Sequence, residues 1–533
     1  MNKQERVRAF AIAAVALPGL LLSAAIASAN GNGVGRSLTN ANPAPLTGSV
    51  PRADCGPSDR TEAGLQGQVT PEERSSGDSA LGYNCNLELV GQYRGEGAYS
   101  QGGPAFFGDC AYMTTDHITP LQQHHGVTVI DASDPRHPQP TAYLDDTPAM
   151  LAPHETLKVN AGRKIMAAGQ NNGSNFAVYD LSGDCRHPVR MSSIDLPGSK
   201  GHMGNFAPDG RTYYLTQSFR GVGGKLYVVD LDDPANPKEL PPWTFQGDGR
   251  PHEAWLNAAG TRLYAGQPGL FGAAPTDSSF GPDGLVIDDV SDYQFRLPNP
   301  QIRIVSKLFW DDQGQAEPMY PVTVNGHPYI ISGDEDGGQG GAGGLPAACA
   351  RGASHSGYSN IIDISDETHP KIVATIMLEV NDPANCSRML NDPPDVGGEI
   401  PTYSPERCTA DRQTNPTMLA CGLWAAGVRV FDIRDILHPK EIAYYKPPAP
   451  GTAFLPSSGT WAPGIDSTFD KVAGYMSFHE VPRANGHANE HGNARSARDV
   501  ELWFVSDGNG FQVLRFTDRF KALHKDLFED LGQ

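Results

Sequence analysis

Short hydrophobic runs rich in β-branched and aromatic residues recur along the chain, and six of the seven end in an aspartate. The copies are Gly126–Asp131, Phe176–Asp180, Leu226–Asp230, Leu285–Asp289, Asn360–Asp363, Val428–Asp432 and Phe511–Arg515. Consecutive copies end 49 to 83 residues apart, which is the spacing of β-propeller blades with insertions of different lengths. The pattern predicts an all-β fold, a single seven-bladed β-propeller in which each run is the third strand of a blade, counted from the axis.

Turns that contain proline follow most of these runs and lead to another strand. Because proline fixes φ and cannot donate to a sheet ladder, we interpret these turns as the hairpins to the outermost strands. Four histidines lie in such turns and are expected to be turn residues: His137, His187, His369 and His438.

The two ends of the repeat region complement each other. The last copy, Phe511–Arg515, has no outer strand after it, whereas residues 86–95 resemble an outer strand with no blade before them. We therefore expect the N-terminal strand to pair with the C-terminal blade, which closes the ring and removes both exposed sheet edges. The predicted propeller spans residues 85–523, and residues 524–533 form a C-terminal tail.

The repeat resembles that of the LVIVD-repeat family of bacterial and archaeal surface β-propellers, and the resemblance covers residues 86–520. It specifies the fold well and the activity poorly. What it implies is an exported propeller that acts as a binding or scaffolding module.

The first 29 residues have the features of a signal peptide. Three basic residues precede an apolar run from Ala9 to Ile26, and the small residues at 27–29 match a signal-peptidase site. We expect cleavage after Ala29 and a secreted or periplasmic protein, with no later segment able to span a bilayer. Residues 30–84 are rich in Gly, Pro, Ser and Asn, which predicts a low-complexity linker or tail.

All eight cysteines lie beyond residue 29, and an even number in an exported protein favours disulfides over thiolate chemistry. We favour pairs between Cys408 and Cys421 and between Cys349 and Cys386, although the sequence alone leaves the connectivity open.

The chain is acidic, with 61 Asp and Glu against 41 Lys and Arg and a formal charge of −20. This charge repels phosphate backbones, so we expect no nucleic-acid partner. Motifs for nucleotide binding or for an activated serine are absent from the sequence. We predict a monomer that meets a small-molecule ligand or a protein partner.

Histidines recur at the start of three predicted innermost strands, as His154-Glu155, His202 and His252-Glu253. Each histidine lies eight residues before the glycine of the following hairpin. His479, next to Glu480, is a fourth candidate with irregular spacing. The corresponding regions of the other blades offer carboxylates that align only loosely: Glu96, Glu317 and Glu399.

Residues at equivalent positions of successive blades must form a ring around the mouth of the central channel. His154, His202, His252 and His479 are therefore candidate ligands of a divalent transition metal such as Zn, Cu, Fe or Mn. Glu155 or Glu253 would be the catalytic base of such a site. The alternative is structural: each histidine caps its strand through a hydrogen bond to a neighbouring blade.

Two functions from different classes remain. The first is a ligand- or protein-binding module that presents the loop-rich face of the propeller, where the loops 116–125, 267–283 and 333–357 are expected. The segment 483–499 is interpreted separately, as an insertion. The second is a metal-dependent enzyme, a hydrolase or an oxidoreductase, with its His/Glu-ligated metal at the channel mouth.

Overall fold

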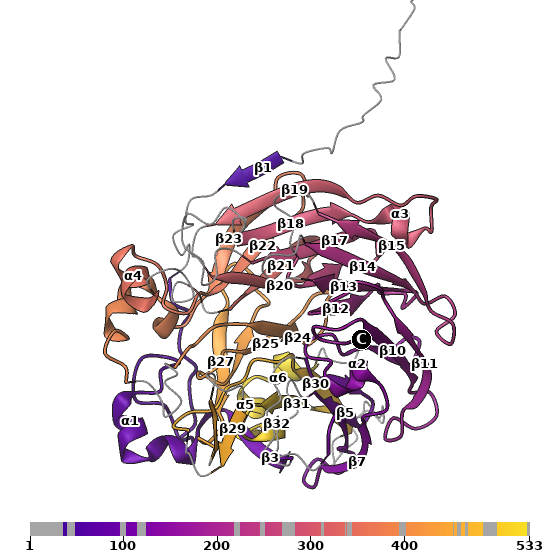
Figure 1. Ribbon diagram of the computed structural model, residues 1–533. Coiled ribbons are helices and arrows are strands. Elements are labelled where there is room, and N and C mark those ends of the chain that lie inside the picture. The colour runs from indigo at the N-terminus through magenta and orange to yellow at the C-terminus, as the bar shows by residue number, and fades with distance from the viewer. Residues whose placement is uncertain are drawn as a thin grey trace, which may run out of the picture. The chain divides into compact units, whose positions relative to one another are not determined.

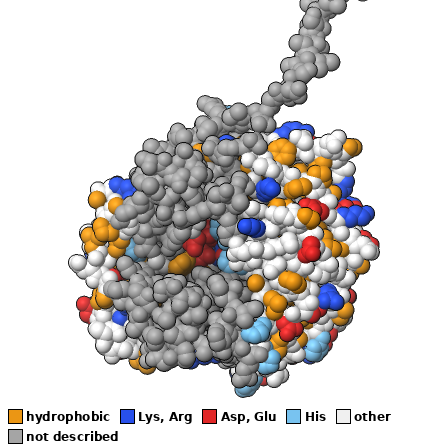
Figure 2. Space-filling view, viewed as in Figure 1, with side chains coloured by type: hydrophobic (Ala, Val, Ile, Leu, Met, Phe, Trp, Pro, Cys, Tyr) orange, Lys and Arg blue, Asp and Glu red, His pale blue; other side chains and the backbone are white. Residues whose placement is uncertain are grey.

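Seven sheets with four core strands each follow one another along the chain and form the blades of a β-propeller (Figure 1). The innermost strands of the first six blades lie side by side in sequence order, from β4 next to β8 to β20 next to β24, as rotation about a common axis requires. The all-β, seven-bladed fold predicted from the repeat is confirmed. On the face shown in Figure 2, the centre is a hollow with acidic and histidine side chains on its floor.

The structure is a computed structural model. It describes residues 36–39, 48–95, 103–114, 124–217, 224–245, 251–268, 283–310, 314–335, 337, 344–393, 401–450, 452–455, 460–463, 467–482 and 498–529. The predicted signal peptide, most of the long loops, Glu96 and Glu399 lie outside these ranges.

The strands of the first three blades are β4 (Ala105–Phe107), β5 (Cys110–Met113), β6 (Val127–Asp131) and β7 (Gln139–Leu144); β8 (Lys158–Asn160), β9 (Ile165–Gly169), β10 (Asn175–Asp180) and β11 (Val189–Asp195); β12 (Gly204–Phe206), β13 (Thr212–Gln217), β14 (Lys225–Asp230) and β15 (Lys238–Thr244). Blade four contains β16 (Ala254–Leu256), β17 (Arg262–Gln267), β18 (Asp283–Asp289) and β19 (Arg303–Trp310), and β1 (Arg36–Thr39) pairs with β19 in parallel. Blade five contains β20 (Gln315–Val324), β21 (His327–Glu335), β22 (Ser359–Asp363) and β23 (Lys371–Ile376).

Blade six contains β24 (Arg407–Ala410), β25 (Met418–Gly422), β26 (Val428–Asp432) and β27 (Lys440–Lys446), and β2 (Tyr83–Cys85) lies beside β27. Blade seven contains β30 (Ser477–Pro482), β31 (Arg498–Ser506), β32 (Gly510–Phe516) and β3 (Leu87–Tyr93). The remaining elements are the hairpin β28 (Thr452–Leu455) and β29 (Thr460–Pro463) and the short helices α1 (Pro71–Ser76), η1 (Asp78–Leu81), α2 (Pro148–Leu151), α3 (Ser291–Gln294), α4 (Gly344–Ala350), η3 (Glu379–Asn381), η4 (Pro383–Arg388), α5 (Asp518–Leu523) and α6 (Lys525–Glu529).

The recurring aspartate ends the third strand by accepting a hydrogen bond from the backbone two residues later. Asp131 Oδ1 accepts from Ser133 N at 2.9 Å, and Asp363 Oδ1 accepts from Ser365 N at 2.8 Å. A side-chain acceptor at this place favours the turn over continued strand. The predicted turn histidines lie in these turns, where His137 Nδ1 is 2.9 Å from Asp134 Oδ2.

The third strands are buried on both faces because neighbouring blades pack against each other. In β10, Phe176 to Tyr179 are all buried, and their side chains alternate between the cores on either side of blade two. Burying such a side chain contributes about 1.5–3 kcal/mol. This double burial explains why the third strand gives the strongest repeat signal in the sequence.

The outermost strand of blade seven is β3, which precedes blade one in the sequence. Strand β3 pairs antiparallel with β32, with Leu87 opposite Phe516 and Tyr93 opposite Phe511. This is the pairing expected from the unpaired strands at the two ends of the repeat region.

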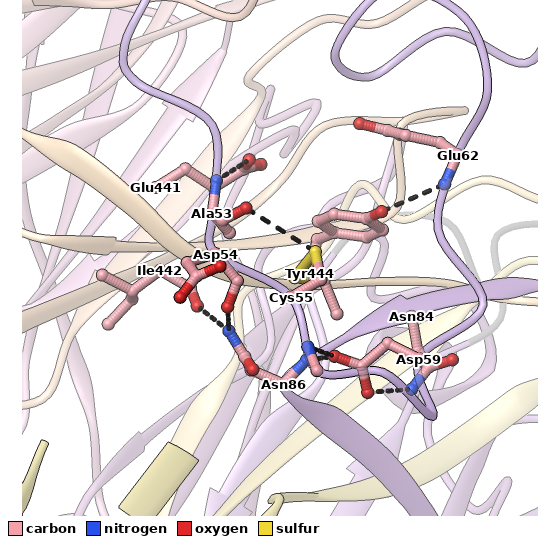
Figure 3. Close-up of a disulfide and its surroundings, with 12 residues drawn as sticks. Ala53, Asp54, Cys55, Asp59, Glu62, Asn84, Asn86, Glu441, Ile442 and Tyr444 are labelled. Carbon is pink, nitrogen blue, oxygen red and sulfur yellow. Dashed lines mark hydrogen bonds between the residues drawn. A yellow bond between two sulfur atoms is a disulfide. The ribbon is translucent and has the colours of Figure 1, made fainter. Parts of the chain in front are cut away.

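Residues 48–85 differ from the linker that their composition suggests. They pack along blade six, where Val50, Leu65 and Val69 are buried in the same core as residues of β25 and β2 pairs with β27. Figure 3 shows the Cys55–Cys85 disulfide among hydrogen bonds that tie this segment to β27, including Ala53 N to Glu441 Oε2 at 3.3 Å. Isolated apolar residues with buried polar partners leave no hydrophobic periodicity, so composition alone missed this packing.

Four disulfides join all eight cysteines, and the predicted pairs Cys349–Cys386 and Cys408–Cys421 are confirmed. The other two, Cys55–Cys85 and Cys110–Cys185, join the N-terminal segment to itself and blade one to the turn after β10 in blade two. This density of disulfides is typical of an oxidising, extracytoplasmic environment. No helix in the described ranges is both long and apolar enough to cross a membrane.

Blade four has a buried carboxyl where the other repeats have an apolar residue. Asp288 is fully buried in β18, and neither of its oxygens has a hydrogen-bond partner among the described residues. Burial raises its pKa to about 7, although Lys307 acts in the opposite direction. The folded protein therefore binds this proton more tightly than the unfolded chain does.

Because the folded-state pKa of Asp288 is raised, its ionisation should cost stability as the pH rises from about 4 through 7. The cost is up to about 4 kcal/mol at pH 8. We expect Asp288→Asn to raise the melting temperature at pH 8 and to have a much smaller effect at pH 5, measured by thermal denaturation. Asp145→Asn, at an exposed position, is the control, and an Asp288→Asn effect that does not change with pH would contradict the account.

Candidate metal centre

The three predicted histidines precede the innermost strands of blades two, three and four, with His154 in a turn at φ 49° and His202 and His252 just before β12 and β16. His202 N donates to Thr216 O at 3.1 Å, and His252 N donates to Gly266 O at 2.6 Å, so both residues extend the pairing of their strand with the next. Thr216 Oγ1 also donates to His252 O at 2.7 Å, which links blade three to blade four. These backbone contacts fix the direction in which the imidazoles leave the strands.

The structure brings His154, His202 and His252 together. The Nε2 atoms of His202 and His252 are 2.9 Å apart. The ring centroids of His154 and His202 lie 4.9 Å apart, and those of His202 and His252 lie 4.7 Å apart. The side chains of His154 and His202 are 13% and 16% exposed, so the group is accessible from one side.

Two buried carboxylates lie next to the imidazoles. Glu155 Oε2 is 3.5 Å from His154 Nε2 and 3.9 Å from His202 Nε2, and Glu317 Oε1, from β20, is 3.3 Å from His252 Nε2. Neither oxygen has a hydrogen-bond partner within the described part of the chain. Burying a carboxylate oxygen without a hydrogen bond is unfavourable in free energy, and a bound cation would offset that penalty.

Arg407 lies beneath these carboxylates and is fully buried. Its Nη2 donates to Glu155 Oε1 and, at 3.0 Å, to Glu317 Oε2, while its Nη1 donates to Glu406. Glu253 Oε2 is 3.9 Å from Arg407 Nε. One guanidinium therefore faces four carboxyl groups.

The register explains why Arg407 reaches the axis. It pairs with Gly422 in blade six as Glu253 pairs with Gly266 in blade four, so the two residues occupy equivalent hub positions. We did not identify Arg407 from the sequence. Its signal is the Glu406-Arg407 pair at the start of an innermost strand, which becomes visible only after that strand has been aligned with the others.

The charges of the hub give its carboxyl groups different proton affinities. Burial opposes ionisation of Glu155, but Arg407 and the three histidines outweigh it and hold the pKa of Glu155 well below its usual range. Burial raises the pKa of Glu317 well above its usual range, despite Arg407. The pKa of His202 is lowered by burial and by the two neighbouring histidines, so its imidazole is neutral, which is the form that binds metals.

Glu253 belongs to a separate part of the hub. Tyr475 OH donates to Glu253 Oε1, and Trp255 Nε1 donates to the same oxygen at 3.1 Å. Glu253 Oε1 thus faces Tyr475 and Trp255, whereas Glu155 Oε2 faces His154 and His202. Of the two predicted bases, Glu155 is the one whose contacts with the histidines the structure shows.

His479 lies apart from the three histidines. Its ring stacks on Trp503 at 4.1 Å, and its Nε2 is 3.5 Å from Asp109 Oδ1. Tyr475 contacts the hub in blade seven, and His479 is four residues further along, or about 13 Å of extended strand. The irregular spacing of this blade concealed the shift in phase.

Carboxyl groups outnumber the cations around the hub. The described residues contribute the carboxyls of Glu155, Glu253, Glu317, Glu335 and Glu406 against Arg407 and Lys158. Lys158 Nζ donates to Glu155 O at 3.0 Å. Ligand atoms within 4.8 Å of one another form three groups here: His154, Glu155 and His202; His252, Glu317 and Glu335; and Glu155, Glu317 and Glu406 around Arg407. The first two combine nitrogen and oxygen donors, which suit divalent transition metals.

Replacing Arg407 with methionine should destabilise the protein by about 3–5 kcal/mol, because the carboxyl groups that it pairs would stay buried without a cation. Arg407→Lys keeps the charge but loses the second arm of the guanidinium, so we expect an intermediate loss. Urea denaturation measures both variants. An Arg407→Met variant as stable as the parent would show that the guanidinium does not balance these carboxylates.

Comparisons with known proteins are limited to the fold. No family model matches the chain, and no curated protein matches it, so the resemblance to the LVIVD-repeat family stays a prediction. Among solved structures, the chain is similar to a protein from Lactobacillus plantarum (10% identity over 62% of this chain and 80% of that one, TM-score 0.41). It is also similar to Kuenenia stuttgartiensis hydrazine synthase (12% identity over 80% of this chain and 96% of that one, TM-score 0.43). A third similar structure is Saccharomyces cerevisiae Sqt1 (9% identity over 81% of this chain and 99% of that one, TM-score 0.44).

Proposed function

We propose that this chain is an exported β-propeller that binds a divalent transition metal at the mouth of its central channel and acts there as a metal-dependent enzyme, a hydrolase or an oxidoreductase. The observation that carries the proposal is the contact of 2.9 Å between the Nε2 atoms of His202 and His252, with buried carboxylate oxygens on both sides. Because 2.9 Å is also the length of a hydrogen bond between two imidazoles, the carboxylate oxygens beside the pair are what distinguish a metal site from a structural contact.

The donor set favours Zn, Cu, Fe or Mn over a thiolate-bound metal. All eight cysteines are in disulfides, so the available donors are imidazole nitrogens and carboxylate oxygens. When bound, such an ion supplies Lewis-acid or redox chemistry. The residues of this chain hold the ion, and the partly exposed side of His154 and His202 leaves a direction from which a small molecule can approach.

Export is the second part of the proposal. The four disulfides and the signal-peptide features of residues 1–29 support a secreted or periplasmic protein. The second candidate function, a ligand- or protein-binding module, keeps the same fold and requires no metal chemistry. The fold itself favours it, because propellers commonly serve as binding scaffolds.

The metal content of the purified mature protein tests the central part. We expect at least one equivalent of a transition metal by elemental analysis, and a large loss of it in the His202→Ala variant. His137→Ala is the matched control, because His137 is an exposed turn histidine paired with Asp134. Protein that stays metal-free after incubation with Zn²⁺, Mn²⁺ and Cu²⁺, while remaining folded, would end the proposal.

Bound metal should also stabilise the fold. A ligand at 100 times its dissociation constant contributes about 2.7 kcal/mol, so removal by a chelator should lower the melting temperature of the parent but not that of His202→Ala. Enzymatic activity should be lost together with the metal. An activity that survives unchanged in His202→Ala would contradict the enzymatic part and leave the binding module as the better account.

A further inference from the structure

The ligand atoms at the channel mouth divide into two groups. His154, Glu155 and His202 form the first, and His252, Glu317 and Glu335 form the second; within each group the ligand atoms lie within 4.8 Å of one another. The two groups approach each other where His202 Nε2 and His252 Nε2 are 2.9 Å apart, and Arg407 Nη2 donates to a carboxylate of each. Glu155 lies beside His202, and Glu317 lies beside His252.

We infer that the centre holds two metal ions, one in each group. This inference rests on the proposed function and extends it from one ion to two. A single ion bound to both His202 and His252 would take one ligand residue from each group, whereas two ions would use all three residues of each group.

Each group contains a buried oxygen that faces its histidines. Glu155 Oε2 and Glu317 Oε1 both lack a hydrogen-bond partner among the described residues, and the two side chains are 5% and 1% exposed. Each of these oxygens lies beside an imidazole nitrogen, Glu155 Oε2 at 3.5 Å from His154 Nε2 and Glu317 Oε1 at 3.3 Å from His252 Nε2. An ion in either group would therefore gain both a nitrogen and an oxygen ligand.

Arg407 arranges the two carboxylates as a pair. Its single Nη2 atom donates to Glu155 Oε1 on one side and to Glu317 Oε2 on the other. Each carboxylate therefore uses one oxygen for the guanidinium and directs the other towards its own histidine. The guanidinium cannot fill the metal positions, because it contacts the oxygens opposite to those that face the imidazoles.

The second group is built on a different blade from the first. Glu317 lies in β20, and Glu335 ends β21 in the same blade, where Gln315 Nε2 donates to Glu335 Oε2. His154 and Glu155 precede β8 in blade two. Substitutions in one group can therefore be made without altering the strands that carry the other.

Titration with Mn²⁺, followed by elemental analysis after gel filtration, tests the second ion. The parent should bind two equivalents per chain, and Glu335→Gln and His154→Ala should each bind one. Glu367→Gln is the control, since Glu367 is a half-buried carboxylate that pairs with Arg262 in the outer part of the blades. Melting curves of the metal-free variants establish that they fold.

Electron paramagnetic resonance of the Mn²⁺-loaded parent gives a readout that needs no variant. Two ions a few ångströms apart should couple magnetically and broaden the six-line signal that an isolated ion gives. One equivalent with an uncoupled spectrum, or an unchanged stoichiometry in Glu335→Gln, would overturn the second ion and leave the proposed function intact. No bound metal at all would overturn both.

Discussion

The pairing of Arg407 with buried carboxylates is the interaction on which the centre of this propeller depends. Residues at the starts of the innermost strands meet at one axis, and Glu155, Glu253, Glu317 and Glu406 lie there around Arg407. Without a cation their mutual repulsion and desolvation would oppose closure of the ring. A guanidinium stays charged when buried and donates in several directions in one plane, so it holds Glu155 and Glu317 at the same time.

The same arrangement prepares the carboxylates for a second partner. Each gives one oxygen to Arg407 and presents the other to the imidazoles of His154, His202 and His252. His202 and His252 are held by backbone pairing that continues their strands towards the axis, whereas His154 lies in a turn before β8. Rigid donors and desolvated oxygens are what a metal site requires before the ion arrives.

The repeat in the sequence was sufficient to predict the fold and most of the histidine cluster. Rotation about an axis converts equal sequence phase into spatial proximity, so His154, His202 and His252 could be placed together without coordinates. His479 could not, because blade seven contacts the hub through Tyr475, four residues earlier. The role of Arg407 could not be predicted, because a single arginine gives no repeat signal. The packing of residues 48–85 could not be predicted either, because their buried contacts with blade six have no periodicity in the sequence.

The most direct test is an anomalous diffraction map from crystals of the metal-loaded protein, measured at the absorption edge of the metal. The account predicts a strong peak within bonding distance, about 2 Å, of the Nε2 atom of His202. A map without a peak there, in which His202 and His252 keep their direct contact and Glu155 and Glu317 bind only Arg407, would contradict it.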